Sequence, residues 1–331
     1  MNHLLQANVP AVILAPMEGV TDAPMRALQG ETGAFTYAVS EFLRISHSVP
    51  PKHVYFTHMP ELRTNGTTRT GLPVQVQLLG GDPDRMAAAA VVAHECGATA
   101  IDLNFGCPAK TVNRHDGGAT LLKHPQRLRA IVRAVCEALP KEVPVSAKMR
   151  LGWDSIDSID ENAAMAADGG AAWITIHGRT RQAGYAPPIF WEPIGRIRAN
   201  LPIPVVANGD IWSFDDFLRC RDATGCIHFM LGRGALANPE LSHRVAQELG
   251  VASRLNGERL NWIEQLQRLV YWTHELRERP PQNMVRRLKQ WLKMASTCGT
   301  FAEFDAIKLA SDVPELLELL SGTLQVVARM Q

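Results

Sequence analysis

The 331-residue chain lacks the features that mark several specialised protein classes. Its formal net charge is only +1 and charged residues make up 20% of it, so neither disorder nor a globally basic nucleic-acid binder is indicated. No apolar run approaches the ~20 residues that a membrane-spanning helix needs, so we expect no bilayer span. Hydrophobic residues make up 46%, which is ample for a large core.

The six cysteines also lack any paired or metal-ligand spacing. They stand at positions 96, 107, 136, 220, 226 and 298. The apolar stretch from Val9 to Met17 is too short for a secretory signal and is broken by two prolines. We therefore expect a reduced, cytoplasmic enzyme that holds no metal.

Short β-rich runs alternate with longer helical patterns up to residue 249. The predicted strands are residues 12–15, 37–40, 74–78, 100–103, 145–149, 173–177, 205–208 and 228–231. Helical stretches such as 84–96, 126–139, 158–168 and 214–223 lie between them. Eight strand–helix units predict an α/β fold of the (β/α)8 TIM-barrel type. An open, doubly wound sheet is the alternative, although no Gly-rich dinucleotide fingerprint follows the first strand.

Beyond residue 249 the strand pattern stops and helical patterns take over. They cover residues 261–277, 284–295, 301–309 and 314–330, with Pro280-Pro281 as a break. We predict a catalytic barrel over residues 1–249 and a helical domain over residues 250–331. Residues 244–293 contain ten Lys or Arg against five Asp or Glu, which predicts a basic face or an ordinary solvated helix surface.

Catalytic groups of a TIM barrel gather at the carboxyl ends of its strands. The candidates there are Pro16, Met17, Glu18, Gln77, Asn104, Cys107, Lys148, His177, Asn208, Gly209, Asp210, Gly232 and Arg233. Gly232-Arg233-Gly234 suits a phosphate, because bare backbone N–H groups can approach closely while the guanidinium neutralises charge. We expect FMN across the barrel mouth, with Gln77 at its pyrimidine edge and Lys148 near N1 and O2, where negative charge gathers on reduction.

Each of these residues also has an ordinary structural interpretation. Gln77 could fill a strand, Lys148 could form an ion pair, and His177 could be a satisfied core histidine. Cys107 could be a small buried hydrophobe, as most free cysteines are. Its neighbours favour display at a strand end, because Gly106 widens the allowed backbone angles and Pro108 restricts Cys107 towards extended geometry.

Six motifs in order along the chain resemble those of the tRNA-dihydrouridine synthase family. They are APMEGVTD at 15–22, NFGCP at 104–108, KMRLG at 148–152, HGRT at 177–180, NGD at 208–210 and GRGA at 232–235. The resemblance implies an FMN enzyme that uses NADPH to reduce uridines of tRNA to 5,6-dihydrouridine. It implies hydride transfer from flavin N5 to C6 of uracil, with Cys107 giving the proton to C5. A thiol with the ordinary pKa of about 8.5 is protonated at neutral pH and can serve as that acid.

The resemblance also implies contacts with the tRNA. Asn104 and Arg179 would hold the uracil edge or the adjacent ribose-phosphate. The target base must leave its stack to reach the barrel mouth. The helical domain would contact phosphates through Arg286, Arg287, Lys289 and Lys293. Trp291, which lies among them, would either stack on a base or fill the core.

Four strings most resemble the bacterial C-type branch of the family, whose target is position 16 of tRNA. They are SEFLR at 40–44, KTVN at 110–113, GWDS at 152–155 and LKQWL at 288–292. For that branch, Arg44, Tyr185, Arg287 and Lys289 would orient the tRNA. The string RHDGG at 114–118 departs from the family pattern, and His115 either adjusts the Cys107 proton or is solvated. We expect a monomer, since the substrate would already span both domains.

Three other functions remain open from the sequence. A flavin-dependent ene-reductase or dihydroorotate-dehydrogenase-like enzyme shares the fold but leaves the basic helical domain without a role. A lyase or isomerase would use Lys148 as a base or in a Schiff base. A catalytically idle tRNA-binding protein would need the basic face alone.

Overall fold

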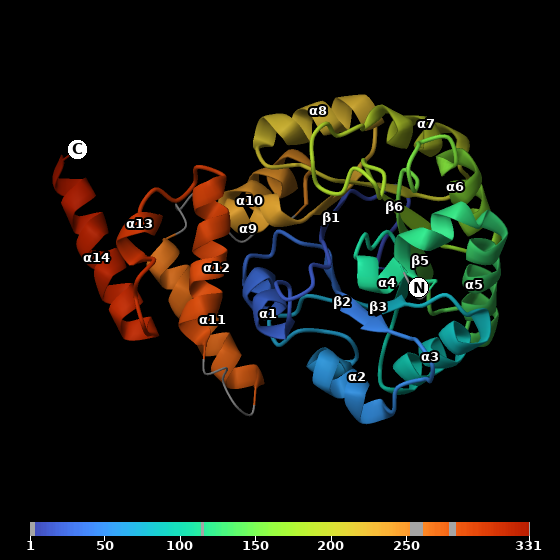
Figure 1. Ribbon diagram of the computed structural model, residues 1–331, viewed down its shortest axis with the longest axis horizontal. Helices are drawn as coiled ribbons and strands as arrows, with labels where there is room; N and C mark the ends of the chain where they lie inside the picture. Colours follow the sequence, from blue (N-terminus) through green and yellow to red (C-terminus); the bar gives the residue numbers. More distant parts are fainter. Residues whose placement is uncertain (1–3, 114–115, 252–260, 278–282, 331) are drawn as a thin grey trace.

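The computed structural model describes residues 4–113, 116–251, 261–277 and 283–330, in which eight parallel strands close into a barrel in chain order (Figure 1). The strands are β1 (Ala11–Leu14), β2 (Tyr37–Arg44), β3 (Val74–Leu79), β4 (Ile101–Phe105), β5 (Val145–Arg150), β6 (Trp173–His177), β7 (Val205–Asn208) and β8 (His228–Leu231). β1 pairs with β8, with Ala11 opposite His228, and this pairing closes the ring. The predicted TIM barrel is confirmed, and the open sheet is excluded.

Helices follow the strands, and most of them form an outer ring around the barrel, whereas α4 lies inside that ring in this view (Figure 1). They are α1 (Ala23–Glu31), α2 (Lys52–His58), α3 (Pro83–Glu95), α4 (Lys110–Asn113), α5 (Pro125–Ala138), α6 (Ile159–Asp168), α7 (Glu192–Asn200), α8 (Phe214–Thr224), α9 (Arg233–Ala237) and α10 (Pro239–Glu248), with the 3-10 helices η1 (Pro60–Thr64) and η2 (Gly118–Lys123). Local sequence explains where they begin. Asp82 caps α3 by accepting a hydrogen bond from the Arg85 amide, and Pro83 occupies the first turn, where no backbone donor is needed.

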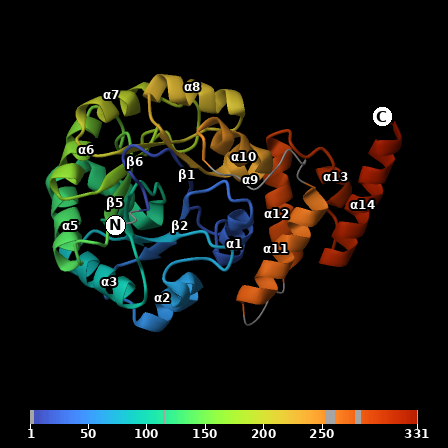
Figure 2. The same cartoon turned by 180° about the vertical axis from the view of Figure 1, so that it is seen from behind.

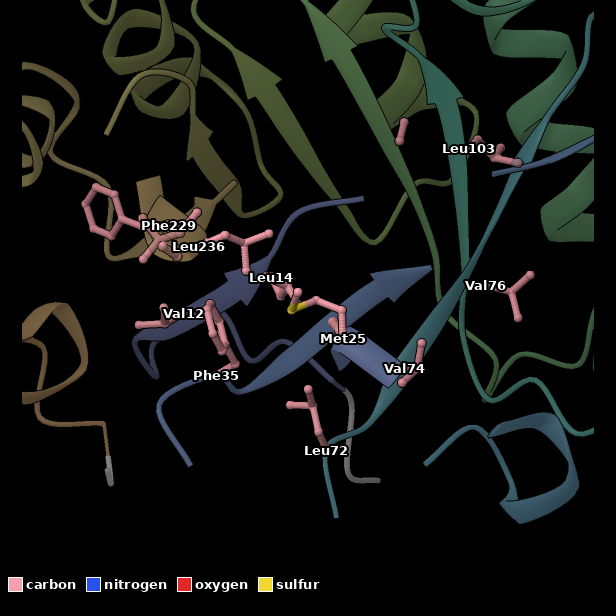
Figure 3. Packing of buried hydrophobic residues seen from close by; sticks show 14 of the residues in the cluster. Val12, Leu14, Met25, Phe35, Leu72, Val74, Val76, Leu103, Phe229 and Leu236 are labelled. Carbon is pink, nitrogen blue, oxygen red and sulfur yellow. The ribbon is translucent and has the colours of Figure 1, made fainter. Parts of the chain in front are cut away.

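Buried apolar side chains fill two layers on either side of the strands. Between strands and helices, Val12 and Leu14 of β1 lie near Met25 of α1 and Phe35 (Figure 3). The alternate residues of the strands form a second cluster, in which the rings of Tyr37 and Trp173 meet edge to face at 6.2 Å. Because both faces are covered, the strands are almost entirely buried, as is usual for a parallel sheet, and the polar residues that they carry are buried with them.

The remaining helices lie to one side of the barrel (Figures 1 and 2). They are α11 (Trp262–Leu276), α12 (Met284–Thr297), α13 (Phe304–Ile307) and α14 (Val313–Met330). α11 packs against α1, and α12 packs against α9. Trp291 is only 3% exposed and its indole N–H donates to the Leu236 carbonyl at 2.8 Å, so it is a core residue and not a stacking platform.

Some predictions for this part differ from the structure or fall outside it. The helix expected over 301–309 is confined to the four residues of α13. The predicted break at Pro280-Pro281 lies outside the described residues, and so do residues 252–260, which follow the predicted domain boundary. None of the helices in the described ranges is long and apolar enough to cross a membrane.

Candidate active site

A cavity of about 380 Å³ opens at the carboxyl ends of the strands, within the size range of about 300–1,000 Å³ usual for small-molecule sites. Every predicted cofactor residue lines it: Pro16, Met17, Glu18, Gln77, Lys148, His177, Asn208, Gly209, Asp210, Gly232 and Arg233. Asn104, Cys107 and Tyr185 line it as well. Barrel closure therefore brings together residues that are more than 200 positions apart in the sequence.

Cys107 is held at the rim of this cavity by a constrained loop after β4. The side-chain oxygen of Asn104 accepts hydrogen bonds from the backbone amides of Gly106 (3.0 Å) and Cys107 (2.9 Å). The Nε atom of Arg150 donates to the Gly106 carbonyl at 2.9 Å. Burial raises the pKa of the half-buried Cys107 thiol, against weaker lowering by the Ala109 backbone and the Arg150 charge. The thiol is therefore protonated at neutral pH.

A buried polar network lies beside the loop. Gln77 donates from Nε2 to Asp102 at 2.7 Å and accepts from Asn104 at 2.8 Å, while the Ser146 hydroxyl donates to the other Asp102 oxygen at 2.5 Å. Asp102 is only 2% exposed, and burial raises its pKa to about 6 although the Ser146 and Gln77 hydrogen bonds and the Lys148 charge lower it. One N–H of Gln77 remains for a ligand.

Lys148 and His177 give the cavity one charged group and one neutral group. Lys148 donates to the Asn208 side-chain oxygen at 2.9 Å, and burial lowers its pKa to about 8 although the Asp102 charge raises it. Burial, followed by the positive charges of Arg150 and Lys148, lowers the pKa of His177 well below its usual range. Its buried Nδ1 atom has no hydrogen-bond partner within the described part of the chain. The neutral imidazole is thus available to a ligand.

The segments after β6 and β8 each contribute an arginine beside Asp210, which follows β7. Asp210 pairs with the buried guanidinium of Arg179, and Nη2 of Arg233 lies 3.5 Å from Asp210 Oδ1. The Arg233 guanidinium also lies 4.7 Å from the Tyr185 ring. A side chain at Gly234 would put its Cβ 2.0 Å from the Ile211 carbonyl oxygen, so glycine is needed for α9 to approach the backbone after β7 this closely. Arg233 and Asp210 both line the cavity at this end, and Arg233 brings the positive charge.

Arg179 itself does not line the cavity. Its side chain is 1% exposed, and its Nε donates to the Pro188 carbonyl at 3.3 Å. Asn104 does line the cavity, but both lone pairs of its oxygen and one N–H serve the Cys107 loop and Gln77. Their predicted contacts with uracil stay predictions.

The predicted tRNA contacts on α12 fall into two groups. Arg287 forms a bidentate ion pair with Asp22, the N-cap of α1, and Lys289 donates to the carbonyls of Lys308 (3.0 Å) and Ala310 (2.7 Å). Arg286 and Lys293 are exposed. Arg44 donates to the Thr111 carbonyl at 3.2 Å. His115, proposed to adjust the Cys107 proton, lies outside the described residues.

Several cavity-lining residues were not singled out from the sequence. They include Glu41, Phe42, Arg150, Trp212, Met230 and Met294. Arg150 could have been found, because the two-residue period of a strand puts it on the same face as Lys148. Met294 gave no such signal, since it reaches the cavity only through the packing of α12 against the barrel. Among the residues that the structure describes, no group of His, Cys, Asp and Glu is placed to hold a metal ion.

Comparisons with known proteins give consistent results. The family model described as "Dihydrouridine synthase (Dus)" matches residues 13–318. The tRNA-dihydrouridine(16) synthase of Neisseria meningitidis serogroup A is 42% identical over 316 residues, covering 94% of each chain. That of Aquipseudomonas alcaligenes is 41% identical over 314 residues, covering 94% of this chain and 98% of its own.

Among solved structures, histamine dehydrogenase from Rhizobium sp. 4-9 aligns with a TM-score of 0.53 at 14% identity. The alignment covers 79% of this chain and 49% of that one. At this level of identity the likeness concerns the fold alone.

Proposed function

Because the chain belongs to the dihydrouridine synthase family, we propose that it reduces a uridine of tRNA to 5,6-dihydrouridine. The observation that carries the proposal is Cys107, held protonated at the rim of a cavity that also gathers Lys148, His177 and Arg233. Saturating the C5=C6 bond of uracil requires a hydride at one carbon and a proton at the other. An acid at the rim supplies the proton.

The residues of the cavity fit FMN. Gln77 has one N–H left for the pyrimidine edge, and the buried Nδ1 atom of His177 has no partner among the residues that the structure describes. Arg233 and the bare backbone at Gly232 suit the phosphate, and the positive charge of Lys148 suits the anionic edge of the reduced ring. FMN, reduced by NADPH, supplies the hydride that adds at C6.

Cys107 performs the other half of the addition. Its S–H bond breaks, the proton forms the new C5–H bond, and a thiolate remains that takes a proton back from water. The Arg150 guanidinium, fixed against the Gly106 carbonyl, places a positive charge near that thiolate. The chain thus holds both the acid and a group that stabilises its conjugate base.

We further propose position 16, in the D-loop, as the target. Curated relatives that are about 40% identical over most of the chain carry the name tRNA-dihydrouridine(16) synthase. The base must be extruded to enter the cavity. The helical region would then grip phosphates through exposed side chains such as Arg286 and Lys293, while Arg287 and Lys289 remain predicted contacts by resemblance alone.

The experiment that tests this function separates the two halves of the reaction in Cys107→Ala. The variant should bind FMN and be reduced by NADPH as the wild type is, because the acid plays no part in either event. Its reoxidation by tRNA, followed by flavin absorbance, should lose most of its rate. Cys136→Ala is the matched control, since that thiol lies on α5 outside the cavity lining. Near wild-type reoxidation in Cys107→Ala would remove the proton-donor role.

A further inference from the structure

Four polar side chains on three adjacent strands form one continuous hydrogen-bonded chain that ends at the Cys107 loop. β3 and β4 pair with Gln77 opposite Asp102, and β4 and β5 pair with Asp102 opposite Ser146. The links are Ser146 to Asp102 (2.5 Å), Gln77 to Asp102 (2.7 Å) and Asn104 to Gln77 (2.8 Å). Asn104 then accepts from the amides of Gly106 and Cys107. We call this set the Asp102 chain.

In every hydrogen bond between the loop amides and Asp102, the donor and the acceptor are fixed by the backbone amides at one end and by the carboxylate at the other. Backbone amides can only donate, so Asn104 must turn its oxygen towards Gly106 and Cys107. Its NH₂ group then faces Gln77, which must present its oxygen there and its own NH₂ group to Asp102. An ionised carboxylate can only accept, so Asp102 completes the sequence without conflict. Reversing any one amide would bring two donors or two acceptors face to face.

Because these groups are buried, a hydrogen bond that is lost or reversed is costly. Gln77, Asp102 and Ser146 are almost inaccessible to solvent, and Asn104 is buried. Water cannot replace a link that is lost or reversed, and an unpaired polar group in such surroundings is strongly unfavourable. Ser146 accepts in turn from Gln75 at 2.9 Å, which anchors the far end in the barrel interior.

We propose that Asp102 is a positioning residue, which acts through Gln77 and Asn104 to hold the Cys107 loop in the conformation that presents the thiol to the cavity. The importance of that conformation for catalysis rests on the proposed function, whereas its dependence on Asp102 does not. Gln77 is also the proposed contact for the pyrimidine edge of the cofactor. The Asp102 carboxylate therefore orients both Gln77, in the proposed cofactor site, and the loop that carries Cys107.

The test uses one substitution to reverse the hydrogen bonds of the Asp102 chain and a second to restore matched donors and acceptors. Asn104→Asp keeps an oxygen that accepts from both loop amides, but it replaces the NH₂ group that faces Gln77 with a second carboxylate oxygen. Gln77 must then rotate its side-chain amide so that its NH₂ group faces residue 104. Its oxygen then faces the Asp102 carboxylate, which is also an acceptor. Asp102→Asn repairs this conflict, because the introduced amide can donate to the turned Gln77. Alone, Asp102→Asn preserves the native direction, since its oxygen still accepts from Gln77 and its NH₂ group faces the Ser146 hydroxyl.

The readout is the alkylation rate of Cys107 by iodoacetamide, followed by mass spectrometry of its peptide without tRNA. Asn104→Asp should raise the rate roughly tenfold, as expected if an unpaired buried group loosens the loop. The double variant should return to within about twofold of Asp102→Asn. Cys136 in the same samples is the control for general unfolding, and its rate should not change.

An unchanged rate in Asn104→Asp would overturn the proposal, and so would a double variant as reactive as Asn104→Asp alone. A matching rise at Cys136 would also overturn it, because the effect would then be global destabilisation and not a local loosening. Tests of the proposed function are separate. If wild-type protein makes no dihydrouridine while the alkylation rates behave as expected, the function fails and the role of Asp102 in positioning the loop stands.

Discussion

Burial at the barrel mouth is the largest cause of the pKa shifts of Cys107, Lys148 and His177. Burial raises the pKa of the thiol, lowers that of the lysine to about 8, and lowers that of the histidine well below its usual range. At neutral pH the thiol is therefore protonated, most of the lysine is charged, and the imidazole is neutral. These are the states that proton delivery and anion stabilisation require.

The raised pKa of Cys107 predicts a displaced pH profile for its alkylation. Iodoacetamide reacts with the thiolate, so a higher pKa leaves less reactive sulfur at any given pH. The midpoint of the rate against pH should lie above the value of about 8.5 for a free cysteine. Alkylation of the Cys107 peptide from pH 7 to pH 10 measures it. A midpoint below that of free cysteine would contradict the raised pKa, and a rate that is already on its plateau at pH 7 would mean a thiolate at neutral pH and would contradict the acid role.

At the scale of elements, α12 joins the helical region to the active-site rim. Arg287 pairs with Asp22, Trp291 donates to Leu236, and Met294 lines the cavity. Arg277 also contacts Asp22, at 2.5 Å. Although burial raises the pKa of Asp22, the hydrogen bonds and charge of Arg287 lower it below its ordinary value. Asp22 is thus an ionised anchor between α1 and α12.

Arg287→Ala should therefore destabilise the protein, because it leaves a largely buried carboxylate with Arg277 as its one arginine partner within the described residues, beside the Met25 amide. Removing one partner of a buried pair costs about 3–5 kcal/mol, and the remaining arginine should reduce this to about 2 kcal/mol. Arg286→Ala, at the neighbouring exposed position, should change the free energy of unfolding by less than about 0.5 kcal/mol. Urea unfolding of both variants provides the comparison. Equal effects would show that the Asp22 pair contributes no stability.

Particular elements show what the sequence could and could not predict. The run at 173–177 is rich in β-branched residues and follows a pair of glycines, and its predicted strand agrees with β6 to the residue. The cofactor-site candidates follow from their places at strand ends, and all of them line the cavity. The Asp22–Arg287 pair joins residues 265 positions apart, and the approach of Met294 depends on how two helices dock. Local patterns carry no information about such long-range contacts.

At the scale of the whole molecule, the cavity and α12 together define the face that would meet the tRNA. The barrel supplies the cavity, and α12 adds Met294 to its lining and carries the exposed cations Arg286 and Lys293. The nearly neutral net charge means that this attraction must be local. We therefore propose that the barrel and the helical region act together on the tRNA.

Reversing charges on this face should weaken tRNA binding. Arg286→Glu with Lys293→Glu should lower affinity and flatten its salt dependence, with the slope falling by about one for each phosphate that the protein no longer neutralises. Arg133→Glu with Lys141→Glu is the matched control, because both side chains are exposed and lie away from the cavity, on α5 and before β5. Titrations at several salt concentrations measure both. Equal decreases in affinity for the two double variants would place the binding face elsewhere.

Mapping of dihydrouridine in tRNA that initially lacks it tests the central claim most directly. Purified protein loaded with FMN is incubated with that tRNA and NADPH, and the modified position is read by mass spectrometry of nuclease fragments. We predict a single dihydrouridine at position 16, and none with Cys107→Ala over the same time. Absence of dihydrouridine from flavin-loaded wild-type protein would contradict the account, and a product only at another position would contradict the assignment to position 16.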